Sequence, residues 1–119
     1  LSAEEKRVIE GKGTEAPFSG EYDDFYPPEG IFVCRKCSNP LFTAEAKFNA
    51  RCGWPGFEDS LDNALLVSGD YHPIYGAEVV CANCGGHLGH TYYNEGFTDT
   101  DTRHCVNSLS IKFKPKSEI

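Results

Sequence analysis

Short segments of alternating apolar and polar residues dominate the chain from residue 31 onward. A period of two is the pattern of half-buried β-strands, and the clearest examples are segments 31–34, 64–68, 77–81 and 104–113. Helical periodicity is weak after residue 15. The pattern therefore predicts a mainly β fold with one helix near the N-terminus.

The N-terminal residues carry the signals of one short helix. Ser2 and Glu5 have the spacing of a capping box, and Gly11 and Gly13 mark the end of the helix. Glycines and prolines then punctuate segment 17–30, which we interpret as an ordered loop. We expect four aromatic residues to hold this loop against the body of the domain: Phe18, Tyr22, Phe25 and Tyr26.

One local pattern occurs twice. Val33-Cys34-Arg35-Lys36-Cys37 is followed by Leu41, and Val80-Cys81-Ala82-Asn83-Cys84 is followed by Leu88. In both copies the leucine stands four residues after the second cysteine. Each copy has the form of a strand that enters a tight Cys-x-x-Cys knuckle and leaves it through a buried leucine, so we predict two equivalent knuckles.

The composition limits the class of protein. The chain has 119 residues, six cysteines and no methionine, with 11 Lys and Arg against 18 Asp and Glu and a net charge of −7. This length is typical of one domain, which we place at residues 1–119. The acidic balance argues against a nucleic-acid partner, and no apolar run approaches the roughly 18–20 residues of a membrane span. Nothing in the sequence indicates an oligomer, so we expect a monomer.

Four of the six cysteines have the spacing of a metal site. The two knuckles supply four thiolates, so we predict one zinc ion per chain held by Cys34, Cys37, Cys81 and Cys84. Four thiolates close the coordination shell, which makes this zinc structural rather than catalytic. Two alternatives are a thioredoxin-like redox pair and a secreted disulfide framework. The first lacks its βαβ context, and clustered Cys-x-x-Cys pairs fit the second poorly.

Cys52 and Cys105 are left over and lie in different surroundings. Cys105 follows Arg103 in the last predicted strand, and a nearby cation lowers the pKa of a thiol, but Cys105 fits equally well as a small buried apolar residue. Cys52 lies in a Gly- and Pro-rich loop beside the only tryptophan, Trp54, either as a mobile resolving thiol or as an incidental one. With a period of two, one face of the last strand carries six residues: Arg103, Cys105, Asn107, Leu109, Ile111 and Phe113.

Two histidines, His87 and His90, follow directly on the second knuckle. They have the spacing to ligate a metal, but the thiolates already fill one site. They also suit the supply of protons or hydrogen bonds to a reacting group. From the pair alone, ordinary surface histidines are the favoured interpretation.

Taken together, these motifs closely resemble the methionine sulfoxide reductase B family. The matches run in the family's order from about residue 5 to residue 113 and include both knuckles. The other matching segments are Gly13-Thr14-Glu15-Ala16-Pro17-Phe18-Ser19-Gly20-Glu21-Tyr22, Cys52-Gly53-Trp54-Pro55-Gly56-Phe57, His87-Leu88-Gly89-His90 and Arg103-His104-Cys105-Val106-Asn107-Ser108.

The resemblance implies two antiparallel sheets of the β-tent type and the reduction of methionine-R-sulfoxide, free or in proteins, to methionine. It assigns Cys105 as the catalytic cysteine, which becomes a sulfenic acid, and Cys52 as the resolving cysteine. The resulting Cys52–Cys105 disulfide is then recycled by thioredoxin or a similar dithiol. The knuckle cysteines match the zinc ligands of the zinc-bearing subgroup.

The resemblance also implies roles for five neighbouring residues. Trp54 contacts the methyl group of the sulfoxide, and Arg103 lies close to the nucleophile. His87, His90 and Asn107 organise the site and help to polarise and protonate the sulfoxide oxygen. The chain departs from the family's pattern at Asn94, where many members have aspartate, at Gly56, where serine is usual, and in segment 99–102.

A non-catalytic zinc-binding β-tent module that binds partner proteins is the alternative. Such a module needs the four knuckle cysteines but has no use for Cys52 or Cys105. Free catalytic thiols and zinc thiolates favour a reducing compartment, so we expect the cytoplasm. Because the chain lacks an initiator methionine, we interpret it as trimmed or processed, and an organelle is the alternative location.

Overall fold

The structure is a computed structural model that describes residues 1–118. Its elements follow one another as one α-helix, nine strands and three 3₁₀ turns within these residues. They are α1 (Ala3–Ile9), β1 (Ile31–Cys34), β2 (Pro40–Thr43), η1 (Ala44–Ala46), β3 (Lys47–Phe48), β4 (Gly56–Phe57), β5 (Leu65–Val67), β6 (Ala77–Cys81), β7 (His87–Tyr93), β8 (Thr102–Val106), η2 (Ser108–Ser110), β9 (Ile111–Lys114) and η3 (Lys116–Glu118).

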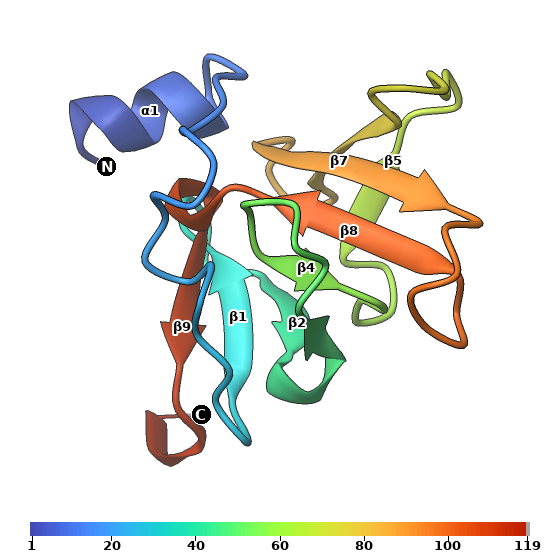
Figure 1. Ribbon diagram of the computed structural model, residues 1–119. Helices are drawn as coiled ribbons and strands as arrows, with labels where there is room; N and C mark the ends of the chain where they lie inside the picture. The colour runs from blue at the N-terminus through green and yellow to red at the C-terminus, as the bar shows by residue number, and fades with distance from the viewer. Residues whose placement is uncertain (119) are drawn as a thin grey trace.

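The strands form two antiparallel sheets, which confirms the predicted fold class. The smaller sheet has the order β2-β1-β9, and the larger has the order β3-β4-β8-β7-β6-β5. In Figure 1 the strands of the smaller sheet run down the view, whereas β7 and β8 run across it. The short strand β4 lies between the two sets of strands and belongs to the larger sheet.

Aromatic side chains fill the space between the sheets. Phe57 on β4 stacks on Phe42 of β2 with ring centroids 4.1 Å apart, and it meets Phe32 of β1 edge-on at 5.1 Å. All three side chains are completely buried. Because Phe57 belongs to one sheet and its two partners to the other, these contacts join the sheets into one core.

The predicted strands 31–34 and 77–81 match β1 and β6, and segment 64–68 contains β5. The prediction of one strand over 104–113 is wrong. This segment is divided by η2 into β8 and β9, which lie in different sheets. Leu109, Ile111 and Phe113 therefore do not continue the face of Cys105.

Side-chain hydrogen bonds explain this break. The Asn107 side-chain amide donates to the Leu88 carbonyl at 3.1 Å, and the Ser110 hydroxyl donates to the His87 carbonyl at 2.8 Å. In both bonds a side chain, rather than the backbone of a neighbouring strand, binds a carbonyl at the start of β7. The chain leaves the larger sheet at Asn107 and enters the smaller one at Ile111.

The N-terminal predictions are confirmed in part. The Ser2 and Glu5 capping box is present at the start of α1. In the following loop, Tyr22 and Phe25 pack against the core as expected. Tyr26 also holds the loop to the domain, because the ammonium group of Lys47 on β3 lies over its ring, 3.8 Å from the ring centroid. Phe18 does not, since it is 71% exposed.

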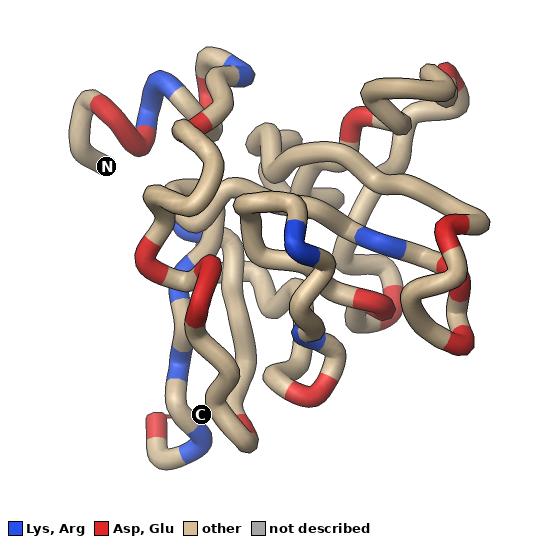
Figure 2. Tube along the Cα trace, in the orientation of Figure 1, with Lys and Arg blue, Asp and Glu red and all other residues tan. Residues whose placement is uncertain are grey.

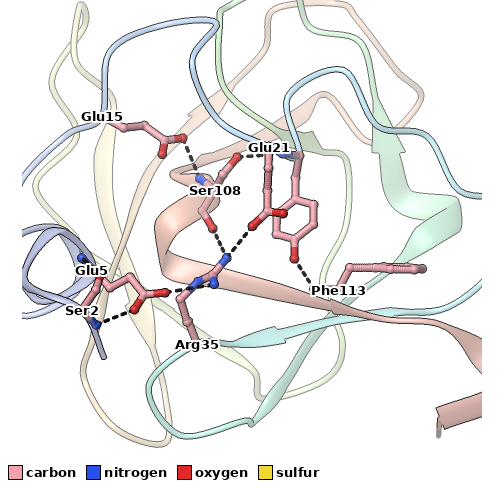
Figure 3. A network of polar contacts seen from close by, with 8 residues as sticks. Ser2, Glu5, Glu15, Glu21, Arg35, Ser108 and Phe113 are labelled. Carbon is pink, nitrogen blue, oxygen red and sulfur yellow. Dashed lines mark hydrogen bonds and ion pairs between the residues drawn. The ribbon is translucent and has the colours of Figure 1, made fainter.

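Arg35 ties the first knuckle to three other parts of the chain. Figure 3 shows its guanidinium donating to Glu5 in α1, to Glu21 in the N-terminal loop and to the Ser108 carbonyl in η2. The donor–acceptor distances are 3.0, 3.2 and 3.1 Å. Only 15% of the Arg35 side chain is exposed, so its bonds to Glu5 and to the Ser108 carbonyl are shielded from water, whereas Glu21 is 64% exposed.

Charged residues are spread along the whole trace. Figure 2 shows acidic positions on many loops with basic positions interspersed among them, so the charge of −7 is not concentrated in one element. Among residues 1–118, no helix has the length and apolar character that a membrane crossing requires.

The position of Phe57 between the sheets generates a stability prediction. Phe57→Ala should lower the free energy of unfolding by about 3–5 kcal/mol, because it empties a fully buried site in contact with both Phe32 and Phe42. Leu66→Ala is the matched control, since Leu66 is 59% exposed and should change stability by no more than about 0.5 kcal/mol. Urea unfolding measures both, and equal losses would contradict the proposed joint between the sheets.

Candidate functional site

The four knuckle cysteines meet at one point between the two sheets. Cys34 and Cys37 come from the hairpin of β1 and β2, and Cys81 and Cys84 come from that of β6 and β7. Their four sulfur atoms lie within 4.8 Å of one another. The clustering brings together two hairpins that are far apart in the sequence.

The two knuckles have the same backbone, as the sequence repeat predicts. In the first, Ser38 N–H donates to the Cys34 carbonyl at 2.8 Å; in the second, Gly85 N–H donates to the Cys81 carbonyl at the same distance. Ser38 and Gly85 both have left-handed backbone angles, with φ of 65° and 75°. The leucines that follow, Leu41 and Leu88, are completely buried.

The spacing of the sulfurs fits a tetrahedral metal ion. Zinc bonds of about 2.3 Å to four sulfurs imply edges of about 3.8 Å between sulfurs. The Sγ atoms of Cys34 and Cys84 are 3.7 Å apart, and those of Cys37 and Cys81 are 3.6 Å apart. The four thiols could therefore hold one metal ion without rearrangement of the hairpins.

A second site lies on the face of the larger sheet. The strand register places Cys105 on β8 between Gly56 on β4 and His90 on β7. A cavity of about 350 Å³ opens above this row. Six of the residues selected from the sequence line it: Cys52, Trp54, His90, Arg103, Cys105 and Asn107.

Cys52 and Cys105 form a close pair of free thiols. Their sulfurs are 3.2 Å apart, and the Cys52 sulfur also lies 3.3 Å from the Trp54 carbonyl. The hydrogen bond between the sulfurs lowers the pKa of Cys52 to about 6, and together with burial it raises the pKa of Cys105. The positive charge of Arg103 lowers the pKa of both, so the pair retains one thiolate more easily than isolated thiols do.

Arg103 is held in place from two sides. Its guanidinium makes two hydrogen bonds to the Glu95 carboxylate, at 2.8 and 3.1 Å, and stacks over the Tyr92 ring at 4.1 Å. Only 12% of the Arg103 side chain is exposed. A bidentate contact and a ring face together fix the plane of the guanidinium beside the thiols.

The two histidines differ in position. His90 lines the cavity, and its pKa is lowered by burial and by the nearby His87. His87 does not line the cavity; it lies behind His90, with ring centroids 5.8 Å apart. The His87 Nδ1 atom is 2.9 Å from the Glu78 carboxylate. The surface-histidine interpretation is wrong for His87, whose side chain is 4% exposed.

Glu15 organises the opposite wall of the cavity. Its carbonyl accepts a 2.9 Å hydrogen bond from the Trp54 indole, and its N–H donates to the Asn107 side chain at 3.0 Å. Its carboxylate accepts a 2.7 Å bond from the Ser108 N–H. The amide of Asn107 is thus engaged by Glu15 and Leu88, which suits a residue that positions the wall.

Comparison with known proteins places the chain. The family model described as the SelR domain matches residues 1–115. The chain belongs to the SelR family. It is 48% identical over 119 residues to a protein of Oryza sativa subsp. japonica named "Peptide methionine sulfoxide reductase B3, chloroplastic", covering 99% of this chain and 51% of that relative. It therefore spans about half the length of that relative.

Two further comparisons agree with this placement. "Peptide methionine sulfoxide reductase B5" of the same organism is 48% identical over 118 residues, covering 98% of this chain and 85% of the relative. The resemblance drawn from the sequence is therefore confirmed. A structure titled "Crystal Structure of Mis18 'Yippee-like' Domain" superposes with a TM-score of 0.58 over 72% of this chain and 95% of that chain. At 17% identity, this likeness shows the fold alone.

Three acidic residues of this SelR domain were missed by the sequence analysis as site residues. Glu78 pairs with His87, Glu95 pairs with Arg103, and Glu15 joins Trp54 to Asn107. A signal existed only for Glu15, which stands in the matching segment 13–22. Next to Asn94, where many family members have aspartate, Glu95 supplies the carboxylate that binds Arg103.

His104, beside Cys105 on the opposite face of β8, generates a pH prediction. It is 7% exposed, its Nδ1 atom is 2.8 Å from the Thr91 hydroxyl, and burial lowers its pKa to about 4 despite a small opposing effect of Asp59. An unfolded histidine binds a proton near pH 6.5, so the stability that depends on neutral His104 should be lost as the pH falls from about 6.5 to about 4, by roughly 3 kcal/mol at most.

The measurement is urea unfolding of the protein and of His104→Gln between pH 7.5 and pH 4.5. Effects of acid on the thiolates are common to both proteins, so the difference between the two slopes isolates His104. Parallel slopes would mean that His104 does not change its protonation on unfolding.

Proposed function

We propose that the chain is a methionine-R-sulfoxide reductase domain that uses Cys105 as nucleophile and Cys52 as resolving thiol. The observation that supports this most is the pair of sulfurs 3.2 Å apart at the base of a cavity lined by Trp54, His90 and Arg103. A nucleophile, a second thiol, a cation and an apolar wall are the groups that reduction of a sulfoxide needs.

The reaction follows from these positions. Cys105 passes its proton to the Cys52 thiolate, whose sulfur is 3.2 Å away, and attacks the sulfoxide sulfur as the thiolate. The oxygen is protonated, and methionine leaves with its sulfur reduced while Cys105 becomes a sulfenic acid. The Cys52 sulfur then attacks the Cys105 sulfur, water departs, and a disulfide forms. A dithiol such as thioredoxin reduces this disulfide and is itself oxidised to a disulfide. Arg103 favours the thiolate forms throughout.

The remaining residues bind the substrate and move the proton. Trp54, held by Glu15, forms the apolar wall for the methyl group. His90 lies opposite Cys105 in the sheet register and directs a hydrogen bond to the sulfoxide oxygen. His87, paired with Glu78, supports His90 from behind and passes it a proton. Asn107 positions the wall through Glu15.

The four knuckle cysteines are proposed to hold one structural zinc ion. The sulfur edges of 3.7 and 3.6 Å match a four-thiolate tetrahedron. Zinc would contribute binding energy that joins the hairpins and would take no part in the reaction. Arg35, within the first knuckle, donates to the Ser108 carbonyl in η2 and so would link the zinc site to the end of the proposed catalytic strand, β8.

We further propose one domain over residues 1–119 that acts as a monomer in a reducing compartment on free or protein-bound sulfoxides. Free catalytic thiols and zinc thiolates both favour such a compartment. The cytoplasm is the proposed location, and an organelle is the alternative, in line with the chloroplastic relative.

A non-catalytic zinc module that binds partner proteins would use the same fold. It would need the four knuckle cysteines but would leave the Cys52 and Cys105 pair, the bidentate Glu95–Arg103 contact and the anchored Trp54 without a role. The geometry of the cavity therefore favours the reductase.

Cysteine variants test the proposed reaction. Cys105→Ser should abolish reduction of a dabsylated methionine-R-sulfoxide with either thioredoxin or dithiothreitol, because no nucleophile remains. Cys52→Ser should lose turnover with thioredoxin but release one methionine per chain in a single turnover, since the sulfenic acid still forms. Product is measured by chromatography.

The S epimer of the sulfoxide is the control substrate and should not be reduced. Substantial turnover by Cys105→Ser would remove Cys105 from the proposed role. Full thioredoxin-dependent turnover by Cys52→Ser would remove Cys52, and absence of any turnover in the wild-type protein would favour the non-catalytic module.

Metal analysis tests the zinc site. We expect one zinc per chain in the wild-type protein and in Cys52→Ser, and loss of the zinc with marked destabilisation in Cys84→Ser, because three thiolates hold the ion less tightly. Emission spectrometry gives the metal content, and thermal unfolding gives the stability. A folded wild-type protein without zinc would contradict the proposal.

A further inference from the structure

An exposed aromatic residue, Phe18, stands beside the loop that carries Cys52. Its side chain is 71% exposed, although the sequence pattern predicted that it would pack against the domain. Its backbone has a φ of 64°, a left-handed conformation that is unfavourable for a bulky residue. A large apolar side chain held outward in strained backbone points to a use outside the fold.

A hydrogen bond of Phe18 and a close approach of its neighbour Pro17 place Phe18 next to the Cys52 loop. The Phe18 N–H donates to the Gly53 carbonyl at 2.6 Å. Gly53 has a φ of 94°, and a Cβ there would lie 2.6 Å from the Cβ of Pro17, so only glycine allows this approach. The backbone of Phe18 is therefore hydrogen-bonded to Gly53, the residue that directly follows Cys52.

The two sulfurs of the pair differ in accessibility. Cys105 is 9% exposed and lies within the sheet between β4 and β7, whereas Cys52 is only partly buried and lies in a loop. A protein thiolate that reduces the Cys52–Cys105 disulfide must therefore attack the Cys52 sulfur. The Cys105 thiolate is then the leaving group, and Arg103 stabilises it.

We infer that Phe18 is the docking side chain for a dithiol protein of the thioredoxin type that reduces this disulfide. The partner's first thiolate bonds to the Cys52 sulfur and releases the Cys105 thiolate; its second thiol then breaks the mixed disulfide and releases Cys52 as a thiol. Two electrons pass from the partner, which leaves as a disulfide. Phe18 would fill an apolar surface around the partner's nucleophile, as aromatic residues do at the centre of protein interfaces.

This inference rests on the proposed recycling of Cys105 through Cys52, and a reductant comparison tests it separately. Phe18→Asn removes the ring, while asparagine tolerates left-handed backbone and should leave the loop in place. Phe18→Tyr keeps the ring. Leu66→Asn is the matched control, because Leu66 is 59% exposed on β5, at the edge of the larger sheet farthest from β3 and β4.

For Phe18→Asn, kcat/KM for thioredoxin, assayed with its reductase and NADPH, should fall about tenfold or more, as for loss of an aromatic interface anchor. Its kcat with dithiothreitol should stay within about twofold of wild type, because this small dithiol needs no docking surface. Phe18→Tyr and Leu66→Asn should behave as wild type with both reductants.

Three results would overturn the inference. The first is an unchanged kcat/KM for thioredoxin in Phe18→Asn. The second is an equal loss with thioredoxin and dithiothreitol, which would mean that Phe18 serves only the loop. The third is a raised KM for a sulfoxide peptide with both reductants, which would place the ring in substrate binding. Failure of the recycling step itself appears separately, as thioredoxin turnover retained by Cys52→Ser.

Discussion

The crossing of the chain from the larger sheet to the smaller one, at residues 107–110, is the constraint on which the rest of the structure depends. Asn107 is bonded to Leu88 and Glu15, and Ser110 to His87, so the crossing is pinned to β7 and to the N-terminal segment. Gly89 lies where β7 meets β8, and a Cβ there would collide with the Cys105 carbonyl. Cys105 precedes the crossing by two residues, and the close approach of β7 and β8 fixes the position of its backbone.

The crossing also connects the two cysteine sites. Arg35 stands between Cys34 and Cys37 and donates to the Ser108 carbonyl, while the Ser108 N–H donates to Glu15. Glu15 in turn holds Trp54. Rigidity that a bound metal would give to the four-sulfur cluster would therefore be transmitted through η2 to the wall of the cavity, although the two sites use different strands. This connection gives the cluster a physical effect on the site without any role in the chemistry.

Local signals in the sequence predicted much of this arrangement. The capping box of α1, the two knuckles and strands β1 and β6 follow from residues that are neighbours in the sequence. The break in segment 104–113 depends on distant hydrogen-bond partners, and strand alternation cannot reveal these. The pairing of Glu95 with Arg103 could not be predicted from the sequence either, because the turn between β7 and β8 brings the two residues together. The burial of His87 was hidden in the same way, since it depends on contact with Glu78.

The two thiols of the cavity have different freedom to move, and this difference orders the chemistry. Cys105 is held in a ladder with strands on both sides, so its backbone cannot shift without breaking hydrogen bonds, and only rotation of its side chain can move the sulfur. In the proposed reaction, any backbone movement that closes the gap from 3.2 Å to a disulfide bond of about 2.05 Å therefore comes from the Cys52 loop. Arg51, directly before Cys52, has a left-handed backbone with a φ of 58°, which is unfavourable for a residue other than glycine, so the loop has strain to release as it shifts. In the proposed reaction, a nucleophile with a fixed backbone keeps its alignment with Trp54 and His90 during attack on the sulfoxide. The second thiol, on a movable loop, reacts only after the oxygen has been transferred.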